Sequence, residues 1–324
     1  MNFKELHDKL VSYDNYSIFG HMNPDGDSIG AIIAMYRILK GLGKNAVMYS
    51  RDGVPDYFRF LPDTDKIIGI EQAGGLNVDT ALLVDCGGPK RTGDEFVPAL
   101  EGANAVFVID HHATNSGFGD LSIVDPEASS TCEIIARYAE HSGLEIDPET
   151  ATCLYCGIMY DTGRFLHSNT TYGVMRLASE MVRQGADPRN VAFNVYNRRS
   201  QAHLRLLGHV LDNMQTTADG RICWAVVERK IYDELGARDE DAEGIVEMLG
   251  SYNGCEVHAT FSQTSNLKSR ASMRSAGRVN IGRICAAFGG GGHDFAAGIR
   301  SGLPLNELAE KVIAEVLKAV RETD

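Results

Sequence analysis

The sequence contains no apolar run long enough to cross a bilayer and no recognisable secretory leader. Its 324 residues hold nothing near the ~18 consecutive apolar residues of a membrane-spanning helix. The first 21 residues lack a basic start, an apolar middle and a small-residue cleavage site, and they are typical of an amphipathic helix followed by a strand. We therefore expect a soluble, cytoplasmic protein without a membrane partner.

Regularly spaced cysteines are also lacking. The seven cysteines form no even framework, and most lie in apolar segments, so we expect them to be reduced. Cys153 and Cys156 make a C-x-x-C pair inside a helical pattern, without a second pair at zinc-site spacing. Core packing is the favoured interpretation, and neither cysteine is assigned a role.

Positive charge is scarce, since the formal net charge is -13. Affinity for long nucleic acids comes largely from Lys and Arg contacts with phosphates, so we expect no long-duplex partner, whereas a short phosphorylated substrate remains compatible. One stretch differs, because no Asp or Glu occurs between Glu256 and Asp294. Local positive potential is expected there from its basic residues, which include Lys268, Arg270, Arg274, Arg278 and Arg283.

The length and the order of patterns predict two domains, because single hydrophobic cores usually stop growing near ~250 to 300 residues. The first half alternates short β-rich runs with helical patterns, which is typical of parallel βαβ units. The apolar runs 80–85 and 105–110 indicate strands covered on both faces. Further helices are expected at about 130–142, 148–160, 172–184 and 200–214.

The pattern changes after Gly220, where strands are expected at 221–229, 255–263 and 267–275, with a helix at 243–249. The sequence thus predicts an α/β fold with a Rossmann-like parallel sheet in residues 1–190. A helical linker, 191–215, would join it to a smaller α+β domain with a mixed sheet, 216–324.

The segment after the first expected strand offers three polar side chains within seven residues, namely His21, Asp25 and Asp27. Pro24 and Gly26 favour a tight turn that leaves space around the backbone. Taken alone, such a turn is also compatible with solvated aspartates or a helix cap.

A second motif follows the apolar run 105–109, where Asp110, His111 and His112 come in direct succession. Three titratable groups at the end of a buried strand are costly without partners. A helix cap plus a satisfied histidine is the structural alternative. We favour function, with one histidine as a metal ligand and the other as a catalyst.

Asp85 and Asp161 complete the set, each beside glycine-containing turns. Either alone is compatible with a cap. Four segments that deliver Asp or His to one sheet edge, where open α/β sheets hold their sites, predict a common metal centre. Carboxylates with a minority of imidazoles suit Mn²⁺, with Mg²⁺, Co²⁺ or Zn²⁺ as substitutes.

These motifs resemble a known superfamily. H-x-N-P-D-G-D, the strand-end Asp85, D-H-H and D-T-G-R-F are similar to the DHH phosphoesterases, and SMRSAGRVNIGRI with FGGGGHDFAAGI resembles their C-terminal partner domain, DHHA1. The resemblance covers nearly the whole chain. It is strongest to the stand-alone bacterial branch, nano-RNases that also act as phosphatases on 3′-phosphoadenosine 5′-phosphate (pAp).

The resemblance implies two metal ions that share Asp85. One would be held by His21, Asp25 and Asp85, and the other by Asp27, Asp85, His111 and Asp161. Beside Asp85, the catalytic group would include His112, which contacts the phosphate or protonates the leaving oxygen, and Asp110, which orients a histidine.

The resemblance also implies that the second domain binds the terminal phosphate of the substrate. A flexible linker is a poor interpretation of the glycine run, because apolar stretches flank it. Arg270 is alternatively a solvated strand charge. The implied contacts are Arg274, His293, Gly290, Gly291, Gly292, Ser272, Ser275 and Arg270.

The implied activity is Mn²⁺-dependent hydrolysis of short RNA or DNA oligonucleotides to mononucleotides, together with conversion of pAp to AMP. A phosphodiesterase for linear or cyclic dinucleotides is the nearest alternative. A single-strand DNA exonuclease would want an OB-type domain and a basic channel, and a pyrophosphatase or exopolyphosphatase would want a different second half. A catalytically silent nucleotide-binding module and a homodimer both remain open.

Overall fold

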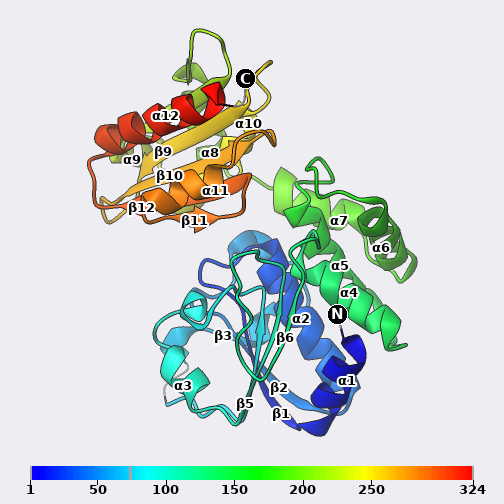
Figure 1. Cartoon of the computed structure of the whole chain (residues 1–324). Helices are drawn as coiled ribbons and strands as arrows, with labels where there is room; N and C mark the ends of the chain where they lie inside the picture. Colours follow the sequence, from blue (N-terminus) through cyan, green and yellow to red (C-terminus); the bar gives the residue numbers. More distant parts are fainter. Residues whose placement is uncertain (1, 73–74, 323–324) are drawn as a thin grey trace. The chain divides into compact units, whose positions relative to one another are not determined.

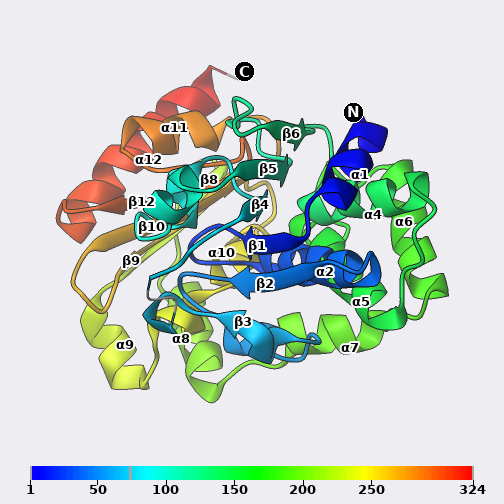
Figure 2. The ribbon, with the colours of Figure 1, turned by 90° about the horizontal axis from the view of Figure 1, so that it is seen from below.

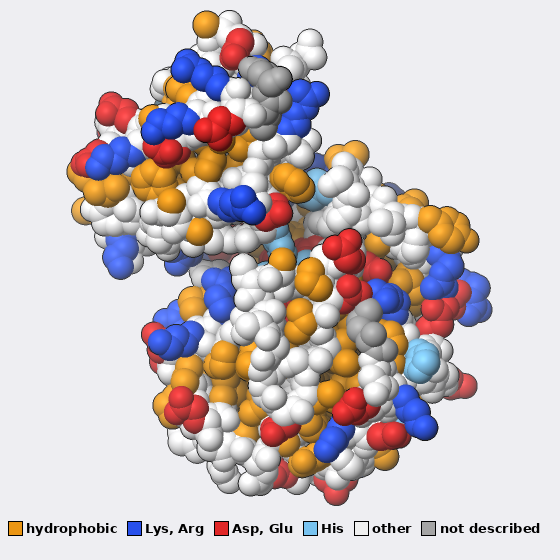
Figure 3. All heavy atoms as spheres, viewed as in Figure 1, with side chains coloured by type: hydrophobic (Ala, Val, Ile, Leu, Met, Phe, Trp, Pro, Cys, Tyr) orange, Lys and Arg blue, Asp and Glu red, His pale blue; other side chains and the backbone are white. Residues whose placement is uncertain are grey.

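The computed structural model describes residues 2–72 and 75–322. The chain divides after Asn197 into two compact units, each described here by itself (Figure 1). Across the described residues, every helix is too short or too polar to cross a membrane. On the face shown in Figure 3, acidic and basic side chains are interspersed.

The first unit is built on a six-stranded sheet in which every pair of neighbours is parallel. The strand order is β3-β2-β1-β4-β5-β6, so the chain winds outwards from β1 in one direction and then, from β4, in the other. This is the doubly wound order of Rossmann folds. The strands are β1 (Asn15–Phe19), β2 (Asn45–Tyr49), β3 (Ile67–Ile68), β4 (Thr80–Val84), β5 (Ala105–Asp110) and β6 (Leu121–Val124).

Helices cover this sheet on both faces, which explains why every residue of β4 is buried. Leu82 and Val84 belong to the larger core, whereas Ala81 and Leu83 belong to a smaller core on the other face. In the larger core α2, α4 and α5 pack against one another (Figure 2). The helices of this unit are α1 (Phe3–Ser12), α2 (Gly26–Gly41), α3 (Val97–Glu101), α4 (Thr131–His141), α5 (Pro148–Asp161), α6 (Tyr172–Arg183) and α7 (Pro188–Ala192).

Two glycines allow α5 to approach its neighbours closely. A Cβ atom on Gly30 of α2 would lie 2.6 Å from the Cys153 carbonyl oxygen, and one on Gly157 of α5 would lie 2.6 Å from Asp27 Oδ1. Both distances are too short for a real side chain, so any larger residue at these positions would push the helices apart. The packing of α2 on α5 therefore fixes the start of α2, where Asp27 lies.

The second unit holds a mixed six-stranded sheet in the order β11-β12-β10-β9-β8-β7, in which only β8 and β9 are parallel. α11 (Ile281–Ala287) and α12 (Leu305–Arg321) share one core with this sheet, and α8 (Gln201–Asp212), α9 (Arg229–Leu235) and α10 (Ile245–Leu249) share the other. The predicted fold class is confirmed. The strands are β7 (Gln215–Thr216), β8 (Ile222–Val227), β9 (Val257–Gln263), β10 (Ser269–Ser275), β11 (Gly291–Gly292) and β12 (Ala296–Ser301).

The segment expected to be a helical linker, 191–215, lies on both sides of the division. The end of α7 and a turn of π-helix, Phe193–Asn197, belong to the first unit. α8 belongs to the second unit, where Leu206 and Val210 enter the core. The boundaries 190 and 215, and the role of the segment as a linker, stay predictions.

Candidate metal centre and phosphate pocket

The acidic and histidine side chains singled out in the sequence meet at the carboxyl ends of β1, β4 and β5. The winding direction changes between β1 and β4, and in doubly wound sheets ligands bind outside the carboxyl ends of the strands at this point. α5 adds a carboxylate from its last residue. The side chains brought together are His21, Asp25, Asp27, Asp85, Asp110, His111, His112 and Asp161.

His21 forms one side of the centre and is buried. Its Nε2 lies 3.3 Å from Asp85 Oδ2 and 3.7 Å from Asp25 Oδ2. Its Nδ1 lies 2.9 Å from the Met22 carbonyl oxygen, so a proton on Nδ1 is donated to the backbone. This arrangement orients Nε2 towards the carboxylates, as in histidines that bind metals.

Asp25 serves as both a helix cap and a member of the cluster. Its Oδ1 accepts hydrogen bonds of 3.0 Å from the backbone N–H groups of Asp27 and Ser28, which caps α2. Its Oδ2 faces His21. Oδ1 thus forms the helix cap that the sequence allowed, while Oδ2 is turned towards the cluster, where its role as a metal ligand stays a prediction.

The amino terminus of α4 holds Asp27 in place. The fully buried carboxylate accepts hydrogen bonds from the backbone N–H groups of Thr131, at 2.6 Å, and Cys132, at 2.9 Å. The Thr131 hydroxyl also donates to Asp85 Oδ1, at 3.2 Å. The positive end of the helix dipole therefore stabilises Asp27, and a side chain from the same helix end stabilises Asp85.

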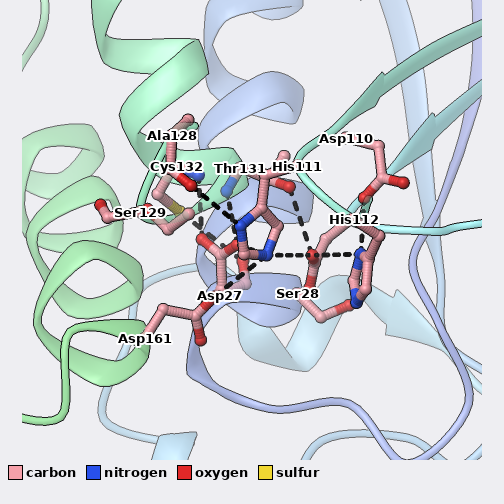
Figure 4. Close-up of polar contacts among 12 residues, drawn as sticks. Asp27, Ser28, Asp110, His111, His112, Ala128, Ser129, Thr131, Cys132 and Asp161 are labelled. Atoms are coloured by element: carbon pink, nitrogen blue, oxygen red, sulfur yellow. Dashed lines mark hydrogen bonds and ion pairs between the residues drawn. The ribbon is translucent and has the colours of Figure 1, made fainter. Parts of the chain in front are cut away.

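His111 points into a group of three carboxylates, of which Asp27 and Asp161 are labelled in Figure 4. Its Nε2 lies 3.2 Å from Asp161 Oδ2, 3.6 Å from Asp85 Oδ1 and 3.9 Å from Asp27 Oδ2. Its Nδ1 lies 3.3 Å from the Ala128 carbonyl oxygen. As for His21, one ring nitrogen faces the backbone and the other faces the acids.

His112 turns the opposite ring nitrogen towards the acids. Its Nδ1 lies 2.7 Å from Asp110 Oδ1 and 3.6 Å from Asp85 Oδ1. Asp110 is fully buried, and its Oδ2 accepts a 2.7 Å hydrogen bond from the Asn115 amide. Asp110 thus orients His112, and Asn115 orients Asp110.

Asp85 lies between the three histidines and adopts an uncommon backbone conformation. Its φ of 53° is in the left-handed region, which residues other than glycine rarely occupy. Such strain persists where the surrounding structure enforces it, commonly at functional sites. Here it accompanies a buried carboxylate that approaches all three imidazoles.

Burial and crowding shift the proton equilibria of the cluster. Burial, followed by Asp25 and Asp85, raises the pKa of Asp161 to about 6 against the opposing effect of His111. Burial disfavours the charged forms of His21 and His111, but their carboxylate partners hold both pKa values well above the usual range. Burial also raises the pKa of Asp27. The five acids of the cluster outnumber its three histidines, which is the electrostatic setting of a cation site.

The donor set fits divalent cations. Three overlapping groups within the first unit bring their ligand atoms within 4.8 Å of one another, and Asp85 belongs to all three. Oxygen ligands with a minority of imidazole nitrogens suit hard and borderline divalent ions. The groups are His21–Asp25–Asp85, Asp27–Asp85–His111 and Asp85–Asp110–His112.

In the second unit, three of the expected phosphate contacts line one pocket. Arg270, Ser272 and Arg274 alternate along β10 and face the core that contains α8 and α10, whereas Ala271 and Met273 face the α12 side. Acidic residues oppose both arginines. The guanidinium of Arg274 lies 2.7 Å from Glu247, and that of Arg270 lies 3.9 Å from Glu243.

Because of these ion pairs, the positive potential that the sequence predicted for residues 257–293 is partly neutralised. Arg278 also has an acidic neighbour, at 3.5 Å from Glu256. The run of sequence without acids is balanced in part by acids from α10 and its flanks.

The other expected phosphate contacts lie in a separate part of the second unit. Gly291 and Gly292 form the short edge strand β11. Gly290 packs so tightly that a Cβ atom would lie 3.0 Å from Ile299 Cα. His293 is exposed and donates its backbone N–H to Ala296, and the described pocket on β10 is lined by neither these residues nor Ser275. Their contact with substrate stays a prediction.

Sequence reasoning missed several residues that build the centre. Asn115 follows Asp110 by five positions. Its place close to the histidine motif is the sequence signal that could have indicated a polar partner for Asp110. Thr131 and Gly157 gave no local signal, because the residues that they contact are distant in the sequence. Thr131 lies 46 residues from Asp85, and Gly157 lies further still from Asp27. No sequence pattern identified Glu247 as the partner of Arg274 either.

The fold and this centre define a class, the metal-dependent hydrolases built on a doubly wound sheet. Residues 15–158 match the DHH family, N-terminal domain, and residues 220–323 match the DHHA1 domain. The chain belongs to the DHH family of phosphoesterases, which are metal-dependent hydrolases. The resemblance found in the sequence motifs is confirmed.

Relatives in several bacteria extend over most of the chain. A bifunctional oligoribonuclease and PAP phosphatase, NrnA, from Thermus thermophilus is 33% identical over 303 residues, which cover 93% of this chain and 88% of the relative. A probable NrnA from Streptococcus mutans is 29% identical over 322 residues, covering 98% and 99%.

A crystal structure of an exopolyphosphatase-related protein from Bacteroides fragilis has the same fold. It superposes with a TM-score of 0.90 at 27% identity, covering 98% of this chain and 95% of that one. Both units of the chain therefore have counterparts in a single solved protein.

Proposed function

We propose that the chain is a Mn²⁺-dependent phosphoesterase that hydrolyses short oligonucleotides to mononucleotides and converts pAp to AMP. The observation that carries this proposal is the buried cluster in which Asp85 approaches three histidines at the switch point of the sheet. The activities in the names of the NrnA relatives, which align over almost the whole chain, support the choice of substrate.

The residues of the cluster divide between two cation sites. His21, Asp25 and Asp85 would hold one ion, and Asp27, Asp85, His111 and Asp161 the other. Mn²⁺ suits this mixture of oxygen and imidazole ligands. When bound, two such ions neutralise charge that develops on the phosphoryl oxygens and activate water for in-line displacement.

We assign His112 the contact with the phosphate and the delivery of a proton to the leaving oxygen. Its Nδ1 donates to Asp110, which fixes the ring and directs Nε2 away from that carboxylate. Burial disfavours the charged ring, but Asp110 and Asp85 together raise its pKa, so the imidazolium form that can donate a proton is stabilised.

In the second unit, the pocket on β10 would hold the terminal phosphate. Arg274, Arg270 and Ser272 present guanidinium and hydroxyl donors on one face of the strand, and guanidinium groups suit phosphate oxygens in geometry and charge. Glu247 and Glu243 keep the arginines oriented before the substrate arrives. We also assign backbone or side-chain contacts to the edge-strand group, namely Ser275, Gly290, Gly291, Gly292 and His293.

The test is a substrate panel with purified protein and Mn²⁺. It compares pAp, pApA, RNA and DNA dinucleotides to pentanucleotides, longer single strands, cyclic dinucleotides and pyrophosphate by kcat/KM. We expect the highest values for short oligonucleotides and pAp. Intact di- to pentanucleotides and intact pAp after prolonged incubation would refute the proposal.

Polyphosphate is a second candidate substrate, because the superposable Bacteroides fragilis protein is described as exopolyphosphatase-related. The same panel therefore includes inorganic polyphosphate of defined length. We expect it to be hydrolysed more slowly than the nucleotides. A higher kcat/KM for polyphosphate would reassign the function. Residence in the cytoplasm and a homodimeric state remain predictions.

A further inference from the structure

Two cysteines of the second unit lie in contact although 32 residues separate them in the sequence. Cys223 belongs to β8, and Cys255 precedes β9, the parallel neighbour of β8. Their Sγ atoms are 2.7 Å apart, and both are thiols. A disulfide bond is about 2.05 Å long, so a small movement of the side chains would join them.

The surroundings make the two thiols unequal. Cys223 is fully buried, and its Sγ lies 3.3 Å from the carbonyl oxygen of Leu249, the last residue of α10. Cys255 is partly exposed and is therefore the one that a small reagent can reach.

Charge and hydrogen bonding also favour a thiolate at Cys255. The pKa of Cys255 is lowered to about 5, first by hydrogen bonding with Cys223 and then, against the effect of burial, by His258. The pKa of Cys223 is raised, first by the same hydrogen bond and then by burial. A reachable thiolate beside a protonated thiol is the arrangement of an attacking and a resolving cysteine.

We propose that Cys223 and Cys255 are a redox-active dithiol, which hydrogen peroxide oxidises to an intramolecular disulfide. The inference stands on the contact between the sulfurs and their unequal exposure, and it does not rest on the proposed hydrolytic function.

The reaction has two steps. The Cys255 thiolate attacks one peroxide oxygen, the O–O bond breaks, and Cys255 becomes a sulfenic acid while the other oxygen leaves as hydroxide, which takes up a proton to form water. The Cys223 sulfur then attacks the Cys255 sulfur, the S–O bond breaks, the S–S bond forms, and a second water leaves with the thiol proton. Two thiols are oxidised and one molecule of hydrogen peroxide is reduced, and a small dithiol restores the starting state.

The disulfide would close a loop that contains α10. This helix carries Glu247, which pairs with Arg274 at 2.7 Å, and its last residue contacts the Cys223 sulfur. Oxidation would therefore tie the segment between α10 and β9 to β8, in the part of the unit that holds the pocket on β10.

The test treats the full-length protein with about one equivalent of hydrogen peroxide, alkylates the remaining thiols and maps the peptides by mass spectrometry without reduction. We expect a linked peptide pair containing Cys223 and Cys255, the loss of two of the seven alkylation sites, and full recovery after dithiothreitol. Circular dichroism before and after oxidation verifies that the protein stays folded.

Variants separate the two roles. Cys255→Ser should abolish the reaction, whereas Cys223→Ser should stop at a Cys255 sulfenic acid that dimedone traps. Cys285→Ser is the matched control, since this buried cysteine of the same unit packs against Met273, and it should leave the linkage unchanged.

Alkylation of both Cys223 and Cys255 after peroxide treatment of the folded protein would overturn the proposal. Faster oxidation of Cys285 than of Cys255 would do the same. Because the readout is thiol chemistry, inactivity towards nucleotides would leave this result unaffected.

Discussion

Among single residues, Asp110 shows how the centre separates binding from positioning. It is buried and bonds to His112 and Asn115, whereas Asp27 and Asp161 approach His111. We infer from these contacts that Asp110 holds an imidazole ring, and we expect its contribution to appear in turnover rather than in the number of ions bound.

We predict that Asp110→Asn lowers kcat for pAp by about 10- to 100-fold, the usual cost of losing a partner that orients a histidine. The amide that replaces the Asp110 carboxylate would not accept the hydrogen bond from His112 Nδ1 in the same geometry, so the imidazole ring would lose its orientation. Mn²⁺ bound per chain, measured by titration, should stay unchanged. Loss of bound ions in Asp110→Asn would show that this residue is itself a ligand, and Asp94→Asn, an exposed change of equal charge, serves as the control.

Residues of this kind differ in how far the sequence could predict them. Asp110 and the histidines were recognisable because they follow directly on an apolar strand. Thr131 was not, since its backbone N–H reaches Asp27 across 104 residues, and no local pattern encodes such a contact. The φ of Asp85 was equally hidden, although the glycines after it permit the turn.

At the scale of elements, the contact between α2 and α5 positions the centre. Arg37 of α2 bonds to Asp147 and Glu149 at the start of α5 and to Asp63. Gly30 and Gly157 allow the two helices to touch further along. Asp27 and Asp161 lie on these helices, so the distance between them depends on this packing.

We predict that Gly157→Ala lowers kcat/KM about 10- to 100-fold, because its Cβ would displace Asp27 and small displacements at an active site have effects of this size. Overpacking should also cost about 1–3 kcal/mol of stability, seen as a lower Tm. Gly41→Ala is the control, since nothing lies within 4 Å of its Cβ position. Full activity in Gly157→Ala would contradict the role of this contact.

A second element-scale prediction concerns pH. Arg37 and hydrogen bonds from Thr150 outweigh burial and lower the pKa of Asp147 to about 2, and Arg37 also contributes to the lowered pKa of Asp63. A carboxylate with a depressed pKa in the folded state stabilises the fold above its usual pKa, and this contribution is lost as pH falls towards 2.

We therefore expect Arg37→Gln to reduce stability at neutral pH by about 1 kcal/mol, a modest value because Asp147 is half exposed. The difference in Tm from the unmodified protein should narrow as pH falls from about 4 to 2. Arg59→Gln, which affects an exposed pair with Asp56, should change Tm little. A difference that stays constant down to pH 2 would mean that the ion pairs are not its cause.

Element prediction succeeded where periodicity was strong and local. The helix expected at 130–142 is α4, Thr131–His141, and that expected at 148–160 is α5, Pro148–Asp161. β3, of two residues, and β11, of two glycines, carry no pattern and depend on their neighbours for pairing. α12 was overlooked, although Leu305, Leu308 and Val312 recur at helical spacing and are buried.

At the scale of the whole molecule, two units with separate cores divide the candidate residues. The first holds the cluster of acids and histidines, and the second holds the arginine pocket. Length and the change of pattern after Gly220 were sufficient to predict two domains. The counterions Glu243 and Glu247 were not predictable, because they meet β10 only after the sheet and α10 have packed.

We predict that Arg274→Ala raises KM for pAp by about 10- to 100-fold, as expected for the loss of a charge-assisted contact with phosphate worth ~1.5–3 kcal/mol. Bound Mn²⁺ should not change, since the ligands lie in the other unit. Arg283→Ala removes the same charge from an exposed position on α11 and should leave KM unaltered. Equal increases of KM in the two variants would mean that Arg274 acts only through its positive charge and not through direct contact with the phosphate.

We propose that one cluster, joined by Asp85, holds two neighbouring ions that hydrolysis requires. Titration with Mn²⁺, followed by electron paramagnetic resonance and by pAp hydrolysis in the same samples, tests this arrangement. We expect two ions per chain, magnetic coupling between them, and activity that rises only when both are bound. Asp85→Asn should lose the coupling and lower kcat by on the order of 10²- to 10³-fold. One ion per chain, or two uncoupled ions with full activity in Asp85→Asn, would contradict it.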